Sequence, residues 1–382
     1  TEFAVRPTPN SHPMLVERIR RGTQRARGKV AATAKRRLPG PSRAALLAVH
    51  ARLVEVWPGA RIVTDMAEAF QVGSELGRGR ASVVYEARDR ATGTAFALKS
   101  IPTSMLAADE DELDSLAVEV RVMARLPPHE HVVALHGVVC SAEETCLVLD
   151  LVAGGDLLGP IEAHGPYTED AARAVFAQLL TALAHCHAHG VAHRDVKPEN
   201  VCFVASPTAL HAKLVDFGLA DFTSGDNDLE GLAGTAVYAA PEVMPWFWEE
   251  RGLGSAAPAD QMAVLDHQRE PSLDWSTNSS HSEGGGGGSR KKPAGAEARP
   301  YGLKSDVWAA GVCLYAMLSA ELPFDQELPM DRLFSKMHSE GVSFSPDVWA
   351  AVSPDAVDCV RYALRVDPAQ RPTLHELLAH SW

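Results

Sequence analysis

The sequence has no apolar run that approaches the ~20 residues of a membrane-spanning helix. It is also poor in cysteine: 382 residues include 6 cysteines, scattered through apolar stretches without any CxxC spacing. A dense disulfide framework is therefore excluded, and we expect free, buried thiols in a reducing compartment. Hydrophobic residues at 46% and charged residues at 22% exclude disorder of the whole chain.

Acidic residues are scarce at the start of the chain. Residues 1–43 hold eleven basic and two acidic side chains, a net charge of +9, so the rest carries −22 and the whole −13. An acidic globular part disfavours nucleic-acid binding, because a phosphate backbone requires a basic face. We expect a cytoplasmic or nuclear protein. The alternative is organellar targeting, since the first segment is rich in Arg and Ala as transit peptides are.

The chain changes its periodicity part-way along. Residues 1–69 are expected to form a basic extension, partly disordered, with a short helix near 44–56. Strands are predicted at 70–76, 82–87, 94–101, 132–139 and 145–151, with a helix at 111–126. Helices are predicted at 168–189, 305–319, 330–339, 354–364 and 373–380. A strand-rich half before a helix-rich half predicts an α+β fold of two lobes with a cleft between them.

One stretch, at about residues 244–299, departs from this pattern. It contains five consecutive glycines at 284–288 and a patch rich in Ser, Asn and His. This composition predicts a flexible insertion. Its first part, Trp246-Phe247-Trp248, is aromatic, and the alternative for that part is packing against the domain.

A glycine-rich turn, LGRGRASVV, spans residues 76–84 between two predicted strands. Glycines let a backbone approach phosphate oxygens and present its N–H groups to them. Ser82 stands where such turns usually have a third glycine, and a plain hairpin would explain the turn equally well. No helix follows at once, which excludes a dinucleotide-binding fold.

Lys99 lies on the second predicted strand after the turn, at residues 94–101. Alone, a lysine among apolar neighbours is most simply a solvated side chain. Placed across from the glycine-rich turn, its ammonium would instead reach nucleotide phosphates, and Glu119 on the next helix would anchor it.

The segment from His193 to Asn200, HRDVKPEN, decides between these interpretations. Asp195 can accept a hydrogen bond from a substrate hydroxyl, and Lys197 can neutralise charge on a transferring group. Asn200 and Asp216, of Asp216-Phe217-Gly218, supply oxygen ligands for Mg²⁺, which bridges the phosphates of ATP. The pattern therefore predicts a metal-dependent phosphoryl-transfer site.

Four histidines near this segment, His185, His187, His189 and His193, suggest a metal site as an alternative. His185 and His189 have the i,i+4 spacing of zinc-binding helices. No HExxH sequence is present and the helix should end at Gly190, so solvated or core histidines are favoured.

Together these motifs resemble the eukaryotic protein-kinase family over about residues 70–382. The resemblance continues through Gly234-Thr235, Ala240-Pro241-Glu242, Asp306-Val307-Trp308 and the closing His380-Ser381-Trp382. It implies the bilobal protein-kinase fold, with an antiparallel sheet lobe at 70–152 and a mostly helical lobe at 153–382. It also implies that Asp306 holds the backbone of the catalytic loop and that Arg371 pairs with Glu242.

The resemblance implies ATP and Mg²⁺ as cofactors and Asp195, Lys197, Asn200 and Lys99 as catalytic residues. Lys197 and Thr235 are the family's pattern for serine/threonine rather than tyrosine substrates. The implied ATP-binding residues come from the glycine-rich turn, the lysine strand, the helix and the connection between the lobes: Leu76, Gly77, Gly79, Ser82, Val84, Ala97, Lys99, Glu119, Leu149, Asp150, Val152 and Asp156.

Several segments look most like calmodulin-dependent and plant-type calcium-dependent kinases, notably Gly154-Gly155-Asp156-Leu157 and the catalytic loop. Members of that group use the acid at Glu199, with another near Asp156, to recognise an arginine upstream of the target. Protein substrates with Ser or Thr in an arginine-containing context are therefore expected. No EF-hand calcium loop occurs in the sequence. The regulatory partner is left open.

The activation segment raises a regulatory question. Arg194 commonly pairs with a phosphate on this segment in the family. Residues 226–232 contain acids but no Ser, Thr or Tyr. The hypothesis is that an acid, Glu230, substitutes for the phosphate, with phosphorylation of Thr223 or Ser224 as the alternatives.

Two other functions are consistent with the motifs. A pseudokinase scaffold could use the insertion as a docking element, but Lys99, Glu119, Asp195, Asn200 and Asp216 are all present. A small-molecule kinase of similar fold is disfavoured by Thr235 and Ala240-Pro241-Glu242, which belong to peptide-substrate machinery.

Overall fold

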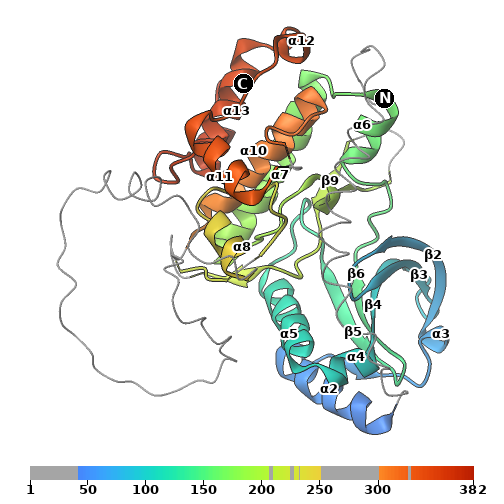
Figure 1. The fold of residues 1–382 in the computed structure, drawn as a ribbon. Helices are drawn as coiled ribbons and strands as arrows, with labels where there is room; N and C mark the ends of the chain where they lie inside the picture. The colour runs from blue at the N-terminus through green and yellow to red at the C-terminus, as the bar shows by residue number, and fades with distance from the viewer. Residues whose placement is uncertain (1–41, 206–209, 224–227, 232, 251–300, 326–327) are drawn as a thin grey trace, which may run out of the picture.

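The chain up to Leu149 contains one six-stranded sheet, and the chain after it forms a mostly helical lobe (Figure 1). The computed structural model describes residues 42–205, 210–223, 228–231, 233–250, 301–325 and 328–382. The sheet has the order β1-β5-β6-β4-β3-β2. Its strands are β1 (Arg61–Ile62), β2 (Phe70–Arg78), β3 (Val83–Asp89), β4 (Ala95–Pro102), β5 (Leu135–Cys140) and β6 (Glu144–Leu149).

Antiparallel pairing connects β2 to β3, β3 to β4, β4 to β6 and β6 to β5, and β1 alone runs parallel to its neighbour β5. Lys99 on β4 is paired with Val84 on one side and Leu147 on the other. Because side chains alternate along a strand, this register fixes the face from which Lys99 projects.

Two helices cover the sheet beside this strand, α4 (Thr103–Ala108) and α5 (Glu110–Arg125). The side chain of Asp109 caps α5 by accepting from the backbone N–H groups of Asp111 and Glu112, and three acids occupy the first turn of this helix. Leu116, Val120 and Met123 are buried at helical spacing. The apolar stripe of the sequence is thus the face that packs on the sheet.

The helical lobe is built around α10 (Lys304–Ser319), in which every residue from Ser305 onward is buried. A helix that is apolar on all sides belongs in a core. Gly311 permits the contact of α10 with α13 (Pro354–Ala363), since a Cβ at residue 311 would lie only 2.8 Å from the Ala363 Cβ. Around it lie α6 (Leu158–His164), α7 (Glu169–Ala188), α11 (Met330–Ser339), α12 (Pro346–Trp349), α13 (Pro354–Ala363) and α14 (Leu374–Leu378).

Short strands position the loops between the lobes. β7 (Val191–Ala192) pairs with β10 (Asp221–Phe222), and β8 (Val201–Phe203) pairs with β9 (Ala212–Leu214). The 3₁₀ turn η1 (Pro198–Asn200) precedes β8. These pairs hold the segments around His193 and Asp216 against the helical lobe.

The sequence expectations differ from the structure at several element bounds. The strand expected from residue 132 begins at Leu135, because Val132 forms a parallel bridge with Leu214 of the helical lobe instead. The helices α4, α6 and α12 are not predicted from the sequence, because they are too short to produce a clear helical period. The bilobal α+β fold itself is confirmed.

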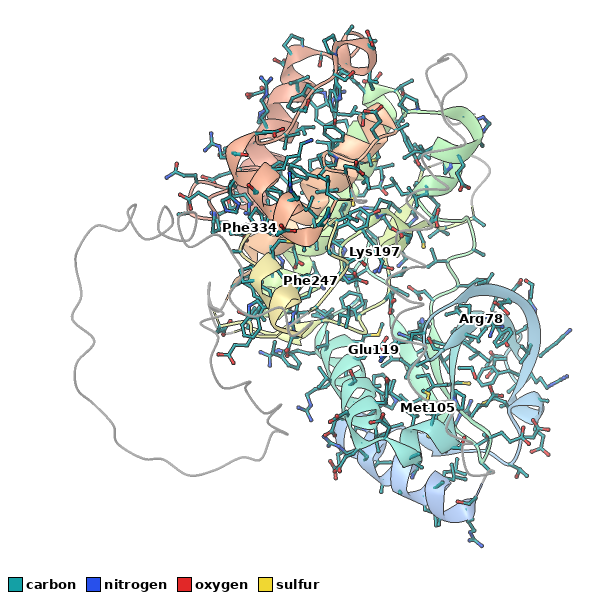
Figure 2. The ribbon with its side chains drawn as sticks, in the orientation of Figure 1. Arg78, Met105, Glu119, Lys197, Phe247 and Phe334 are labelled. Carbon is teal, nitrogen blue, oxygen red and sulfur yellow. The ribbon has the colours of Figure 1, made fainter. Side chains whose placement is uncertain are left out.

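The segment expected to be an insertion begins with a helix, α8 (Met244–Glu250). Met244 and Phe247 of this helix are buried in the core of the helical lobe, where Figure 2 labels Phe247. The aromatic start of the segment therefore packs on the domain. The rest of the expected insertion, residues 251–299, lies outside the described residues.

The expected helix near 44–56 is α2 (Arg43–Val56), followed by β1 and the single turn α3 (Met66–Ala69). The expected disorder of residues 1–41 lies outside the described residues. Among the described helices, none combines the length and apolar character that crossing a membrane requires.

Candidate active site

A cavity of about 720 Å³ lies between the two lobes. All twelve residues expected to bind ATP line it, from Leu76 on β2 to Asp156 after β6. The expectation missed further lining residues on both lobes: Met123, Val133, Cys202 and Val215. These are apolar or small side chains of ordinary core type, so no local motif distinguishes them from other buried residues.

The glycine-rich turn forms the edge of this cavity on the sheet side. The Gly79 N–H donates to the Ser82 carbonyl over 2.8 Å, which closes the turn between β2 and β3. Around Gly77, a Cβ would find no atom within 4 Å, so the backbone there faces open space. Arg80 pairs with Glu112 and thereby ties the turn to α5.

Lys99 forms an ion pair on each side of its ammonium group. Its Nζ lies 2.6 Å from Glu119 Oε1 and 2.9 Å from Asp216 Oδ1. Glu119 is 5% exposed, on the side of α5 that faces Lys99. The strand, the helix and the loop after β9 thus meet at one cation.

The charges of this group shift one another's pKa values. Burial alone would lower the pKa of Lys99, but the carboxylates of Asp216 and Glu119 outweigh it and raise that pKa. The positive charge of Lys99 holds the pKa of Asp216 far below its ordinary value. Both ions are therefore charged at neutral pH. Asp216 keeps half of its side chain exposed to the cavity.

The catalytic-loop side chains form a second connected group. Asp195 Oδ2 lies 2.5 Å from Lys197 Nζ, and the Asn200 amide donates to the Asp195 carbonyl at 2.8 Å and to Oδ2 at 3.1 Å. Thr235 donates to Asp195 Oδ1 at 3.4 Å. Because the Asn200 amide nitrogen is engaged in this way, its carbonyl oxygen remains as a ligand atom.

Asp306 on α10 accepts hydrogen bonds from the backbone of this loop. The N–H of His193 donates to Oδ2 and that of Arg194 to Oδ1, each over 2.9 Å, and His187 contacts Oδ2 at 2.8 Å. Burial alone would raise the pKa of Asp306, but its contacts with His187 and the loop lower it. The loop backbone is strained here, since Arg194 has a φ of 65°.

Asp216 also has a positive φ, of 62°. The side chain of the next residue, Phe217, packs in the core of the helical lobe. Phe217 is fully buried and lies edge-on to the His193 ring at a centroid distance of 4.9 Å. The ring thus anchors the loop in the helical lobe while the Asp216 carboxylate reaches Lys99.

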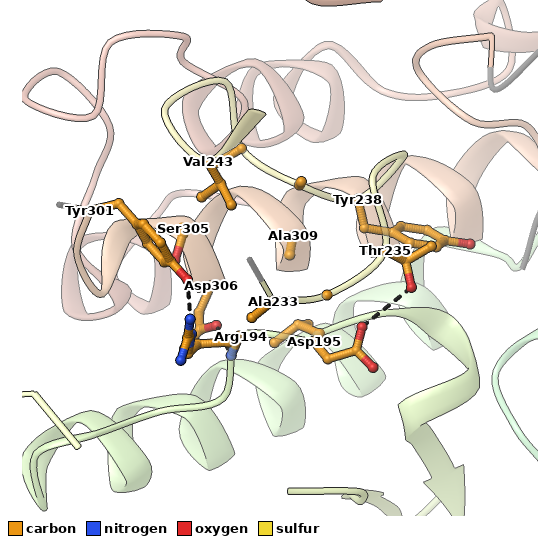
Figure 3. Close-up of a pocket in the computed structure, with 14 residues that line it drawn as sticks. Arg194, Asp195, Ala233, Thr235, Tyr238, Val243, Tyr301, Ser305, Asp306 and Ala309 are labelled. Carbon is orange, nitrogen blue, oxygen red and sulfur yellow. Dashed lines mark hydrogen bonds between the residues drawn. The ribbon is translucent and has the colours of Figure 1, made fainter. Parts of the chain in front are cut away.

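Arg194 lies beside a small cavity of about 20 Å³ that Figure 3 shows. Its Nε donates to the Tyr301 hydroxyl at 2.8 Å, and its NH1 pairs with Asp221 at 3.1 Å. Its NH2 donates to the backbone carbonyls of Glu230 and Gly231. Glu230, expected to present its carboxylate, meets Arg194 through its carbonyl oxygen, and the paired carboxylate belongs to Asp221.

Glu199 is the one charged residue at this cavity whose side-chain oxygens are both buried without a hydrogen-bond partner in the described part of the chain. It lines the interlobe cavity together with Asp156. Burial raises the pKa of the Glu199 carboxyl. A buried acceptor pair without donors is costly to maintain.

The expected Glu242–Arg371 pair is present and bidentate, with N–O distances of 2.7 and 2.9 Å. Arg371 is 1% exposed, and its remaining donors reach the carbonyls of Arg365, Lys304 and Val366. The pair joins the end of the activation segment to the last helices.

The histidines considered as a metal site are hydrogen-bonded instead. His185 contacts the carbonyl of Pro127, His189 that of His185, and His193 that of Val215, while His187 binds Asp306. Within the described ranges, no three His, Cys, Asp or Glu side chains converge as ligands of a metal ion. The structure therefore favours structural roles for these rings.

The site fits a nucleotide that brings its own magnesium. Mg²⁺ takes only one or two protein ligands when phosphates supply others. The Asp216 carboxylate and the Asn200 side-chain carbonyl are two oxygen donors that line the cavity, together with apolar residues such as Val84 and Ala97. The volume suits a ligand of nucleotide size.

Comparison with known proteins agrees with this geometry. The protein kinase domain model matches residues 70–260 and 293–382. The chain belongs to the protein kinase family.

Its relatives include calcium-dependent protein kinases 1 and 9 of Oryza sativa subsp. japonica and 34 of Arabidopsis thaliana. The identities are 32%, 32% and 31%, over 84%, 94% and 84% of this chain. The chain spans about half the length of these relatives, 52%, 50% and 51%. The kinase domain thus accounts for most of the chain and for the fold.

The anchoring of the catalytic loop can be tested with Asp306→Asn. An amide group would leave one buried loop N–H without its acceptor, so we expect a loss of about 1–3 kcal/mol in unfolding free energy at pH 7. Because the pKa of Asp306 is lowered in the folded protein, its ionised carboxyl stabilises the fold fully above the ordinary pKa of 3.8, and this contribution is lost as pH falls from 3.8 through the lower folded-state pKa. The difference between variant and wild type should therefore shrink in acid.

Chemical denaturation between pH 3 and pH 8 measures this difference. Asp358→Asn is the matched control, because the Asp358 side chain is 75% exposed. An Asp306→Asn variant as stable as the control at pH 7 would contradict the anchoring role.

Proposed function

We propose that the chain is a serine/threonine protein kinase that transfers the γ-phosphate of ATP to hydroxyl groups of protein substrates. The observation that carries this proposal is the convergence of Lys99, Glu119, Asp216 and Asn200 in the interlobe cavity, with Asp195 bound by the Asn200 amide. A role in signal transduction belongs to the same proposal and rests on the family relationship alone.

Each residue contributes a defined interaction. The N–H groups of the glycine-rich turn and the Lys99 ammonium would bind the nucleotide phosphates, and Asn200 and Asp216 would hold Mg²⁺. The bound ion would offset negative charge on the phosphates. Asp195 Oδ1 would accept the substrate hydroxyl hydrogen in place of the long contact from Thr235, which orients that oxygen for attack.

Lys197 complements this arrangement. Its ammonium already contacts Asp195 and lies 3.4 Å from the Thr235 hydroxyl. A cation at this position stabilises negative charge on the transferring group and holds the Asp195 carboxylate in one orientation. A pseudokinase scaffold is not favoured, because none of these groups is missing or displaced.

Activity is tested by incubating the chain with ATP, Mg²⁺ and a library of Ser- and Thr-containing peptides. Transfer to peptides is expected, and Asp216→Ala should reduce it by about a hundredfold or more, as the loss of a key electrostatic group does. The matched control is Asp170→Ala, whose side chain is 92% exposed. Absence of transfer by the wild-type chain would overturn the proposal.

We further propose that substrates carry an arginine upstream of the target hydroxyl. No described residue donates a hydrogen bond to the two buried Glu199 oxygens, and a guanidinium supplies two parallel N–H groups that fit a carboxylate. Asp156 lies at the same cavity, although its Oδ1 caps α6 through the N–H groups of Leu158 and Gly159. Glu199 is therefore the main recognition residue of this proposal.

The variant Glu199→Gln should lose the preference for arginine-containing peptides by about tenfold or more in kcat/KM, because a charge-assisted hydrogen bond is lost. The same variant should be more stable than wild type at neutral pH. Burial raises the pKa of Glu199, so the ionised form costs stability increasingly as pH rises above the ordinary value of 4.5.

Peptide kinetics and melting curves from pH 4 to pH 8 check both effects. Glu340→Gln, on a side chain that is 66% exposed, is the control. An unchanged peptide preference, or a stability gain that does not grow with pH, would contradict this role of Glu199.

We also propose that the kinase is competent without phosphorylation of its activation segment. The Arg194 donors are occupied by the Asp221 carboxylate, the Tyr301 hydroxyl and two backbone carbonyls. The acid that compensates Arg194 in this proposal is Asp221. Of the alternative phosphorylation sites, Thr223 donates to Asp228, and Ser224 lies outside the described residues.

Phosphatase treatment should therefore leave kcat unchanged. Asp221→Asn should lower kcat several-fold, because the only carboxylate paired with Arg194 among the described residues is lost. Glu230→Gln should preserve the contact with Arg194, since that contact uses the Glu230 backbone carbonyl. Loss of activity on phosphatase treatment would refute the proposal.

A further inference from the structure

A helix outside the matched kinase domain packs on the helix that carries Glu119. The family match begins at residue 70, whereas α2 spans Arg43–Val56. The Ser42 side chain caps α2 by accepting from the Ala45 N–H at 3.0 Å. Figure 1 shows α2 lying along α4 and α5 on the outer side of the sheet lobe.

The contact is made by one apolar face. Leu46, Val49 and Leu53 follow one another at the spacing of a helix face, and Val49 and Leu53 are fully buried. They share a core cluster with Leu116 and Val120 of α5. These two residues flank Glu119 in the sequence, so the cluster holds the turn of α5 that presents Glu119 to Lys99.

The chain after α2 fastens this helix to the sheet. The His50 ring contacts the Ala60 carbonyl at 3.1 Å. β1 then pairs with β5 in parallel, and the Val63 N–H donates to the Cys140 carbonyl at 2.9 Å. α2 is therefore connected both to α5 and to the sheet behind it, rather than resting on one surface.

A polar contact also reaches α5. The Arg52 guanidinium pairs with Asp114 of α5 at 2.9 Å and with Glu55 of its own helix. The Arg52 and Asp114 side chains are 32% and 41% exposed. Exposed ion pairs contribute little, so the apolar face provides most of the attachment.

We propose that residues 43–63, here named the N-terminal brace, are a positioning element for phosphoryl transfer. The brace holds α5 in the position in which Glu119 reaches Lys99. Without it, the apolar side chains of α5 that face α2 would be exposed to water, and α5 would lose the support that fixes its distance from the sheet. This inference rests on the proposed kinase activity.

The test uses the full chain and compares variants that each change one residue of α2. Leu53→Ala and Val49→Ala remove buried contacts, whereas Leu47→Ala alters the same helix at a side chain that is 49% exposed. We expect the buried variants to lower kcat about tenfold at temperatures far below their melting points, within the usual range of coupling between sites. Amide hydrogen exchange in α5 should become faster in parallel.

Two further variants, together with the Leu47→Ala control, sharpen the result. Leu53→Met preserves apolar volume and should restore most of the activity. Arg52→Ala should change kcat less than about twofold, since exposed pairs are weak. Leu47→Ala should match the wild type in kcat, KM and exchange.

The outcomes separate this inference from the proposed function. If Leu53→Ala lowers only the melting temperature, while kcat and α5 exchange equal those of the wild type, the brace is a stabilising element alone and the inference is wrong. If the wild-type chain transfers no phosphate, the proposed function fails. Hydrogen exchange then still decides the inference, because unchanged exchange of α5 in Leu53→Ala and Val49→Ala would overturn it without any activity.

Discussion

The buried ammonium of Lys99 joins a strand, a helix and a loop that lie far apart in the sequence. Its Nζ is 2.6 Å from Glu119 and 2.9 Å from Asp216. A buried charge is tolerated only when its partners are held in place, so the surrounding structure must fix all three elements together. The register of β4, the packing of α5 and the burial of Phe217 each contribute to this condition.

Two other buried charges, both in the helical lobe, are also held by fixed hydrogen-bond partners. Asp306 accepts hydrogen bonds from two N–H groups of the catalytic loop, and Arg371 forms a bidentate pair with Glu242. Both are about 1% exposed. Each charge therefore specifies one arrangement of a loop against helix α10 or the last helices, because any other arrangement would leave a buried ion without partners. Glu199 is different, since its donors are absent from the described part of the protein.

Local patterns predicted much of this structure, for identifiable reasons. The segment from His193 to Asn200 combines specific residue types at fixed spacing, and this combination rarely occurs by chance, so it indicated the site from the sequence alone. Long amphipathic helices such as α5 and α7 repeat their apolar residues over several turns. The strand expected from residue 132 was predicted to begin too early. Val132 is apolar because it packs beside Leu214 of the helical lobe, not because it belongs to the six-stranded sheet. Pattern alone does not distinguish these two environments.

The sequence by itself determined the family, the bilobal fold and the residue types of the site, since these depend on spacing and on chemistry within short segments. Tertiary structure decided which partner each long side chain takes. Arg194 meets the hydroxyl of Tyr301, 107 residues away, and Arg52 of α2 meets Asp114, 62 residues away. Such pairs follow from the packing of whole helices, whose mutual position is fixed by buried surfaces contributed from many segments at once.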